Sequence, residues 1–255
     1  MSSLLQLSTV QPMVRYVDQE QAIIDTHFTT LPALPPGNAP PPDVVEVLLH
    51  IAGSDGFEDE GRTRLTLRDN AGSIRFDLVH PERWWPAGMG EQPLYTLTLT
   101  LLVGDEIADQ RTMTLGLTSV RRETPDDLMH LRVNGEICEI QSLLFVDRIA
   151  ENRLLPATGD SLLMVRDHYG SQSLYDAADR AGILLIQCIP ISPEGVPSLD
   201  LAQHMERLIP HPSLAGWFVG HLGTAAPRVA KRLQALDPTR TIFLQPPTNP
   251  GQHAA

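Results

Sequence analysis

The stretch SLLMVRDHYGSQSLYDAADRAGILLIQCI, residues 161–189, decides which kind of fold the chain can adopt. Two apolar runs, SLLMVR and GILLIQCI, flank a polar segment whose apolar residues recur at helical spacing and which stops at Gly182. Strands that are apolar on both faces are typical of a parallel sheet covered by helices. The stretch therefore predicts one strand–helix–strand unit of an α/β domain.

The same alternation of strand-like and helix-like segments extends over residues 134–255. The other apolar runs are ICEIQSLLF (137–145), LAGWFVG (214–220) and TIFLQP (241–246), and the other helical segments are SLDLAQHMERLI (198–209) and TAAPRVAKRLQAL (224–236). This region therefore offers about five parallel strands. Parallel strands that alternate with amphipathic helices indicate an α/β region.

Residues 44–133 follow a different pattern. Short runs of alternating apolar and polar residues are separated by the turn sequences GSDG, DNAG and VGDE. The runs are VVEVLLHI, RTRLTLRD, SIRFDLV, LYTLTLTLLV and RTMTLGLTSV. Alternation with turns at this spacing predicts an antiparallel β-sandwich of immunoglobulin-like size. The expected fold class is multidomain β plus α/β, an immunoglobulin-like antiparallel sandwich followed by a βα region of about five parallel strands.

Residues 1–43 precede the expected sandwich. The segment LPALPPGNAPPPD, residues 31–43, holds six prolines, and neither a helix nor a central strand tolerates that density. We interpret residues 1–43 as an N-terminal extension that ends in a proline-rich tether.

Composition excludes several classes of partner. The net charge is -12 with 19 Lys and Arg residues, which argues against nucleic acid and against an anionic membrane. Cys138 and Cys188 lie in apolar contexts without metal-ligand spacing, so we expect buried thiols, no metal and no other cofactor. No run approaches the ~20 apolar residues that cross a bilayer, and the N-terminus has no basic segment followed by an apolar one. We expect a cytoplasmic protein.

Several motifs resemble one known family. The segments RWWPAGMGEQPLYTLTLTLL (83–102), MTLGLTSVRRE (113–123) and LRVNGEI (131–137) look like the immunoglobulin-like domain of glycoside hydrolase family 2 running into its barrel. This family includes β-galactosidases, β-mannosidases and β-glucuronidases. The chain keeps Pro-Leu-Tyr and Asn-Gly, but it has Leu-Gly-Leu-Thr (115–118) where the family shows Phe-Gly-Phe/Ile-Arg.

The resemblance continues through the βα units and covers roughly residues 44–246. It implies that the second region is a partial (β/α) barrel of about five strands, because a closed (β/α)8 barrel takes about 250 residues. The segment VRDHYGSQSLYDAADRAGILLIQ (165–187) is similar to the second barrel strand and the helix leading to the third. HPSLAGWFVG (211–220) matches the fourth strand, and ALDPTRTIFLQ (235–245) matches the fifth.

The resemblance implies a specific chemistry. Retaining glycosidases use two carboxyl groups about 5–5.5 Å apart, one as nucleophile and one as acid/base. In the family the acid/base is the Glu of an Asn-Glu pair directly after the fourth-strand glycine, and here His221 and Leu222 occupy those two positions. The nucleophile follows a seventh strand, beyond the five expected. We therefore expect no catalytic residues in this chain and a carbohydrate-binding or scaffolding role. The alternative is a divergent or fragmentary glycosidase that hydrolyses β-linked sugars.

Six residues are candidates for a sugar site. Arg166 and His168 match family positions near the sugar subsite, while Asp167 and Glu194 are possible substitute carboxylates. The full set is Arg166, Asp167, His168, Glu194, Trp217 and His221. The alternative for the cluster that begins at Arg166 is a hydrogen-bonded loop without ligand.

Other residues admit plainer interpretations. The Trp84–Trp85 pair is a sugar-stacking platform or, as we expect, a packing element. Asp176 and Asp179 are expected on the solvent-exposed face of a helix. His204 and His211 lie seven residues apart across a helix end, with no carboxylate expected to converge on them, and are not expected to form a metal site.

An open parallel sheet raises a physical problem, because its edges carry unpaired backbone groups and its faces are apolar. We expect the edge to be covered by the proline-rich termini, by a second copy in a homodimer, or within a larger assembly. A carbohydrate is the small-molecule partner that we expect.

Overall fold

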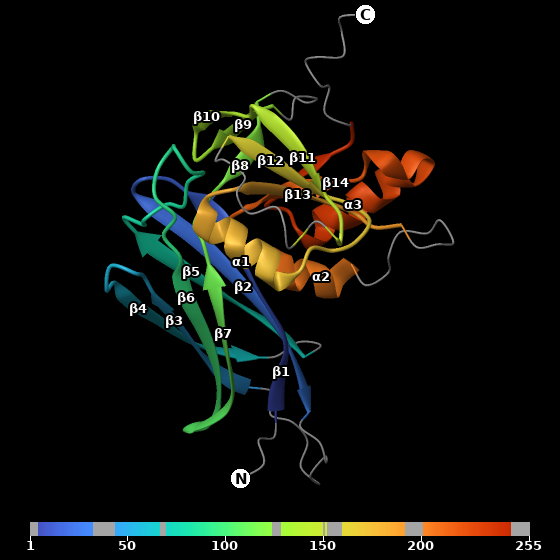
Figure 1. Cartoon of the computed structure of the whole chain (residues 1–255). Helices are drawn as coiled ribbons and strands as arrows, with labels where there is room; N and C mark the ends of the chain where they lie inside the picture. The colour runs from blue at the N-terminus through green and yellow to red at the C-terminus, as the bar shows by residue number, and fades with distance from the viewer. Residues whose placement is uncertain are drawn as a thin grey trace, which may run out of the picture. The chain divides into compact units, whose positions relative to one another are not determined.

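The computed structural model describes residues 5–32, 44–66, 70–123, 129–149, 151, 160–191 and 201–245 (Figure 1). The chain forms two compact units. The first comprises Met1–Glu82 and Pro93–Leu117, and the second comprises Arg83–Gln92 and Thr118–Ala255. The chain therefore passes from one unit to the other three times, and neither unit is a continuous stretch of sequence.

The first unit is a β-sandwich of two antiparallel sheets (Figure 1). One sheet has the order β1-β2-β5 and the other β4-β3-β6-β7. The strands are β1 (Leu5–Val17), β2 (Gln21–Pro32), β3 (Val44–Ala52), β4 (Glu58–Thr66), β5 (Ala71–Val79), β6 (Tyr95–Val103) and β7 (Glu106–Leu115). Every second residue of β3 from Val45 to Ile51 is buried, as alternation predicts, and both sheets contribute to one apolar core.

The expectation that residues 1–43 form an N-terminal extension is wrong for residues 5–32, which form two strands of this sandwich. Strand β2 pairs with both β1 and β5, and Phe28 is buried in the core. Two register shifts interrupt β1, so its apolar residues do not alternate strictly and the strand pattern is hidden in the sequence. Pro12 is tolerated because β1 lies at the end of its sheet. The rest of the predicted tether, residues 33–43, lies outside the described residues.

Side chains of β7 protect the exposed backbone of β1. The backbone N–H of Leu7 donates to Asp109 Oδ2 over 2.8 Å. The Arg111 guanidinium donates to the carbonyls of Leu7 and Ser8 over 3.1 and 3.3 Å. These bonds satisfy groups that would otherwise form an open sheet edge.

The second unit is built around a five-stranded parallel sheet whose strands follow chain order, as expected for a partial barrel (Figure 1). The strands are β11 (Ser142–Val146), β12 (Ser161–Val165), β13 (Leu184–Cys188), β14 (Leu214–Phe218) and β15 (Thr241–Phe243). The connecting helices are α1 (Gln172–Ala181), α2 (Leu201–Leu208) and α3 (Ala226–Leu236), and a 3-10 turn η1 spans Gly220–Ala225. Parallel strands joined in chain order are expected to have right-handed crossovers, which place the connecting helices on one face of the sheet. Among the described residues, no helix is long and apolar enough to cross a membrane.

A small antiparallel sheet, β10-β9-β8, belongs to the same unit. Its strands are β8 (Val120–Arg122), β9 (His130–Val133) and β10 (Glu136–Glu139). Asn134 and Gly135 form the turn between β9 and β10 with φ values of 48° and 90°, which is why the sequence has Asn-Gly there. The expected boundary between residues 133 and 134 is therefore misplaced, because β8 and β9 pair with β10 and residues from Thr118 onward fold with the parallel sheet.

The tryptophan segment 83–92 also folds with the second unit. Trp84 is fully buried, and its indole N–H donates to the Asp179 carbonyl in α1 over 2.7 Å. The Asn134 amide donates to the Trp84 carbonyl over 2.9 Å. The Ala87 N–H donates to the carbonyl of Gly182, where a Cβ would lie 2.5 Å from the Ala87 nitrogen. Of the two interpretations of Trp84, packing is the one that the structure shows.

We predict that Trp84→Ala lowers the free energy of unfolding by about 3–5 kcal/mol, because it removes a fully buried indole and its hydrogen bond. Trp85→Ala is the matched control, since Trp85 is only half-buried and its ring lies under the Arg83 guanidinium, 4.8 Å away. We expect a loss of about 1 kcal/mol there. Urea denaturation measures both variants, and equal losses would contradict the anchoring role of Trp84.

A second prediction concerns Asp25 on the sandwich. Its carboxylate accepts hydrogen bonds from Arg75 Nε at 2.9 Å and Arg15 Nε at 3.0 Å, and the bond from Arg75 is the main cause that lowers the pKa of Asp25. The stabilisation is present above the ordinary pKa of 3.8 and is lost as the pH falls through the lower folded value. Asp25→Asn should cost about 1 kcal/mol at neutral pH and almost nothing in strong acid. Unfolding curves across this range test the prediction, and a difference independent of pH would contradict it.

Candidate functional site

Four of the six predicted sugar-site residues lie after strands of the parallel sheet, at the end where active sites of βα barrels are found. Arg166, Asp167 and His168 follow β12, and His221 lies in η1 after β14. Glu194 lies outside the described residues.

His168 is engaged by protein on both ring nitrogens. The ring is 5% exposed, with Nδ1 2.7 Å from the Arg166 carbonyl oxygen and Nε2 2.6 Å from Glu151 Oε1. Asp167 between them has a φ of 65°, a left-handed conformation that Asp tolerates and that bends the chain back. The hydrogen-bonded loop is therefore what the structure shows, and the His168 ring has no free nitrogen for a sugar.

Glu151 is a partner that the sequence analysis missed. Its Oε1 also accepts the backbone N–H of Ser171 over 2.9 Å, and Ser171 caps α1 by accepting from the Leu174 N–H over 3.2 Å. Burial raises the pKa of Glu151, but the hydrogen bonds from His168 and Ser171 outweigh burial and lower it overall. No pattern around residue 151 signals this role, because the hydrogen-bond partners of Glu151, His168 and Ser171, lie 17 and 20 residues further along the chain.

Arg166 offers an exposed surface for a ligand. Its guanidinium carbon lies 4.1 Å from the ring centroid of Phe145, which is itself 47% exposed at the end of β11. A cation over an aromatic ring is favourable, and exposed aromatic rings also contact the apolar faces of small molecules. Asp167 beside them is exposed as well. This part of the predicted site therefore keeps accessible groups.

The His221–Leu222 pair stands at the end of the fourth parallel strand, as the resemblance implied. His221 Nε2 lies 2.8 Å from the Ile189 carbonyl oxygen, and its ring stacks on Phe218 with centroids 5.5 Å apart. Leu222 is half-buried, and its hydrocarbon side chain neither donates nor accepts a proton. At Gly220 a Cβ would lie 2.1 Å from the Leu244 carbonyl oxygen, so glycine is required there by the fold.

Trp217 is not a sugar contact, which corrects the sequence-based expectation. The side chain is fully buried, and its indole N–H donates to Asp237 Oδ2 over 2.8 Å. Asp237 directly follows α3, and its other oxygen accepts the backbone N–H of Thr239 over 3.0 Å. Trp217 therefore fastens β14 to the end of α3.

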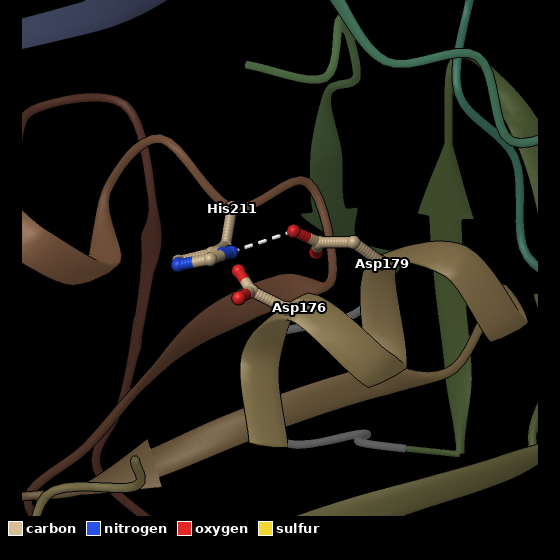
Figure 2. Close-up of side chains that lie close together, drawn as sticks. All are labelled: Asp176, Asp179 and His211. Atoms are coloured by element: carbon tan, nitrogen blue, oxygen red, sulfur yellow. Dashed lines mark hydrogen bonds and ion pairs between the residues drawn. The ribbon is translucent and has the colours of Figure 1, made fainter. Parts of the chain in front are cut away.

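The expectation that Asp179 is exposed is also wrong. Asp179 is 2% exposed, and its Oδ2 lies 2.6 Å from His211 Nδ1 (Figure 2). Its Oδ1 accepts the backbone N–H of Ser213 over 3.1 Å. Asp179 lies four residues after the buried Tyr175, on the same side of α1, so helical periodicity placed it inward. A charged residue in such a position needs a partner from elsewhere in the chain, and His211 supplies it.

Asp176 lies beside this pair, so three possible metal ligands converge within 4.8 Å (Figure 2). Two ligands on one tetrahedral zinc ion at ~2.0–2.1 Å each lie about 3.3 Å apart, farther than the 2.6 Å between His211 and Asp179. The Gln172 amide nitrogen donates to Asp176 Oδ1 and to His211 Nε2, both over 2.9 Å. The geometry therefore fits a complete hydrogen-bond network. His204 takes no part, because its ring stacks on Tyr169 with centroids 3.9 Å apart.

Comparisons with known proteins agree with this architecture. Residues 45–117 match the family model described as glycosyl hydrolases family 2. A β-mannosidase B from Emericella nidulans is 28% identical over 185 residues, which are 62% of this chain and 22% of that protein. An exo-β-D-glucosaminidase from Streptomyces avermitilis is 28% identical over 173 residues, 56% of this chain and 19% of that enzyme.

Solved structures show the same fold over most of the chain. A β-glycosidase from Bacteroides vulgatus has a TM-score of 0.73 at 15% identity and covers 94% of this chain and 34% of its own. A β-D-mannosidase from Dictyoglomus thermophilum has a TM-score of 0.70 at 20% identity and covers 98% of this chain and 36% of its own. In each case this chain spans less than half of the relative. The family model and the curated relatives show homology to glycoside hydrolase family 2, the solved structures show the same fold, and the chain corresponds to one part of these longer proteins.

Proposed function

We propose that this chain is a family 2 module that binds carbohydrate, or serves as a scaffold, without hydrolysing glycosidic bonds itself. The observation that carries the proposal is Leu222, which stands where the resemblance places the acid/base Glu. The strand before it is the fourth of the parallel sheet, the position from which the family's acid/base follows.

The missing carboxylate matters because the retaining mechanism needs two carboxyl groups. Loss of a positioned acid/base lowers the rate by about 10²- to 10⁴-fold. His221 is a poor replacement, because its Nε2 already faces the Ile189 carbonyl oxygen. A glycosidase reaction at this strand end therefore lacks its proton donor.

Sugar binding is supported by the accessible part of the site. Phe145 and Arg166 present an aromatic ring and a cation at the ends of β11 and β12. Together they offer an apolar surface for a sugar ring and hydrogen-bond donors for its hydroxyl groups. The names of the curated relatives, a β-mannosidase and an exo-β-D-glucosaminidase, suggest β-linked mannosides and glucosaminides as first ligands to test.

The second candidate function is a divergent glycosidase, which Asp167 favours. Its carboxylate is exposed at the end of β12, and its backbone adopts the left-handed conformation that often marks functional loops. In this alternative Asp167, with Glu194 as a further candidate, supplies a carboxylate that the family position lacks.

We predict no turnover of aryl β-mannoside, β-galactoside, β-glucuronide or β-glucosaminide substrates by this chain, measured as release of the aryl group. Asp167→Asn and Glu194→Gln are the matched variants. Hydrolysis by the unaltered chain that either substitution abolishes would overturn the non-catalytic proposal and establish the divergent enzyme. Hydrolysis that neither substitution changes would mean that other residues carry out the reaction. This result would also overturn the non-catalytic proposal.

We predict that a β-linked mannoside or glucosaminide raises the melting temperature of the chain, because a ligand that binds the folded state stabilises it by about 2.7 kcal/mol at one hundred times Kd. Phe145→Ala and Arg166→Ala should abolish the shift with little loss of intrinsic stability, since both side chains are exposed. Tyr16→Ala in the sandwich, 46% exposed, is the control and should leave the shift unchanged. Absence of any shift across a glycan panel would favour the scaffold role.

A further inference from the structure

The parallel sheet of the second unit has two edge strands, β11 and β15. Among the described residues, β11 pairs only with β12 and β15 only with β14, while the strands between these edges are buried throughout. At the edges, apolar side chains are partly exposed. Phe145 in β11 is 47% exposed, Leu244 directly after β15 is 49% exposed, and Ile242 within β15 is half-buried. The sheet therefore ends on both sides in strands with accessible apolar surface.

The backbone of each edge strand has hydrogen-bonding groups that face away from the sheet. The Val219 N–H donates to the Phe243 carbonyl over 3.0 Å, so Phe243 faces β14. Because successive residues of a strand alternate in direction, Ile242 presents its N–H and C=O on the opposite side. In β11 the Val146 carbonyl accepts the backbone N–H of the residue after β12 over 2.9 Å, so Phe145 presents its backbone groups away from β12. Each edge has the groups needed to pair with one more strand.

The described part of the sequence gives these two edges none of the usual protection against strand association. Charged side chains, prolines and bonds from other side chains protect exposed edges in folded proteins. In the sandwich, the edge strands β4, β5 and β7 each carry at least two charged residues, and side chains of β7 bond the backbone of β1. Strands β11 and β15 contain no charged residue and no proline. The chain thus protects its sandwich edges, whereas the sequence of its parallel edges favours pairing.

The two faces of β15 are covered within the unit, so its edge is the surface to explain. On one face, Thr241 Oγ1 lies 3.5 Å from the Val120 carbonyl oxygen of β8. Ile242 points to the other face, where its neighbour Trp217 bonds Asp237 at the end of α3. Helix α3 also contacts β15 directly. A further strand at this edge would therefore continue the sheet between two existing layers.

The charges on α3 distinguish between the strands that could pair with β15. Three exposed cations lie at i, i+3 and i+4 on one side of the helix, which contains no acidic residue. They are Arg228, Lys231 and Arg232. Pairing of two β15 strands with each other would bring two such helices together, and like charges oppose that contact. Beside β11 the chain carries two exposed acids, Glu139 and Asp147, and one exposed cation, Arg148. The β11 edge therefore repels the basic helix less than a second β15 edge does.

We propose that this chain associates with a second copy of itself through the parallel sheet, with the β15 edge of one copy pairing in parallel with the β11 edge of the other. Both edges run in the same direction, because all five strands are parallel. A closed parallel barrel joins its last strand to its first in the same way. The contact is head-to-tail, and in the smallest closed assembly two copies pair both edges of each.

This pairing brings the second copy to the proposed sugar site. The strands of a parallel sheet end on the same side, so the partner's Leu244, exposed after β15, adjoins Phe145 and Arg166. The second copy thereby adds apolar surface to the site. This consequence rests on the proposed function, whereas the association itself does not.

Sedimentation equilibrium of the full chain at micromolar concentration, without sugar, tests the association. We expect the mass of two or more chains. Ile242→Pro should reduce it to the mass of one chain, because proline removes the outward N–H, while an edge strand tolerates proline where that N–H has no partner in the sheet. Ile242→Val keeps the N–H and is the matched control, which should associate like the unaltered chain. A single-chain mass for the unaltered protein, or equal masses for the two variants, would overturn the proposal.

A mixing experiment distinguishes head-to-tail pairing from pairing of identical edges. Phe145→Pro blocks the β11 edge in the same way, so this variant should also sediment as one chain. Mixed with Ile242→Pro, it should form a complex of two chains held by a single contact, because it keeps an intact β15 edge and Ile242→Pro keeps an intact β11 edge. Failure of the mixture to associate, or self-association of Phe145→Pro, would contradict the β15–β11 contact. Since no sugar is present, these results are independent of the glycan measurements.

Discussion

The bond from the Trp84 indole to the Asp179 carbonyl is the contact around which the second unit is organised. The segment that carries Trp84 leaves the sandwich after Glu82 and returns to it at Pro93, yet it folds among residues of the parallel sheet and its helices. Asn134 holds the same segment through the Trp84 carbonyl. The segment is thus fixed by contacts with residues distant in sequence, and both of its ends continue into the sandwich.

Asp179 connects the Trp84 segment to the parallel sheet through hydrogen bonds. Its carbonyl accepts from Trp84, while its carboxylate is shared by His211 and the Ser213 N–H just before β14. The guanidinium of the buried Arg240 donates to the His211 carbonyl over 3.2 Å. Arg240 lies directly before β15. One continuous set of buried hydrogen bonds therefore joins α1 to the starts of two strands. Removal of one partner would leave a buried charge or donor unsatisfied, which is why such networks fix a single arrangement.

The sequence predicted those parts of the fold whose signal is local. The order of apolar runs and helices gave five parallel strands, and Asn134-Gly135 marked a turn that the backbone confirms. Strand β1 was missed because register shifts broke its alternation. In the site, the sequence found His168 but not Glu151, and it placed Asp179 in solvent. Both errors have one cause: the state of a charged side chain depends on a partner distant in sequence, which periodicity does not reveal.

The two ends of the parallel sheet carry different constraints, and this explains how Leu222 is compatible with the fold of the sheet. The network of Asp179, His211 and Arg240 lies before β14 and β15, at the end of a βα sheet that maintains stability. Leu222 lies after β14, at the end where such folds place chemistry, and its side chain is only half-buried. At this end the fold itself demands Gly220, where the chain passes close to Leu244. The sheet does not depend on a carboxylate at position 222, two residues after Gly220. The residue at that position can therefore change while the fold stays the same.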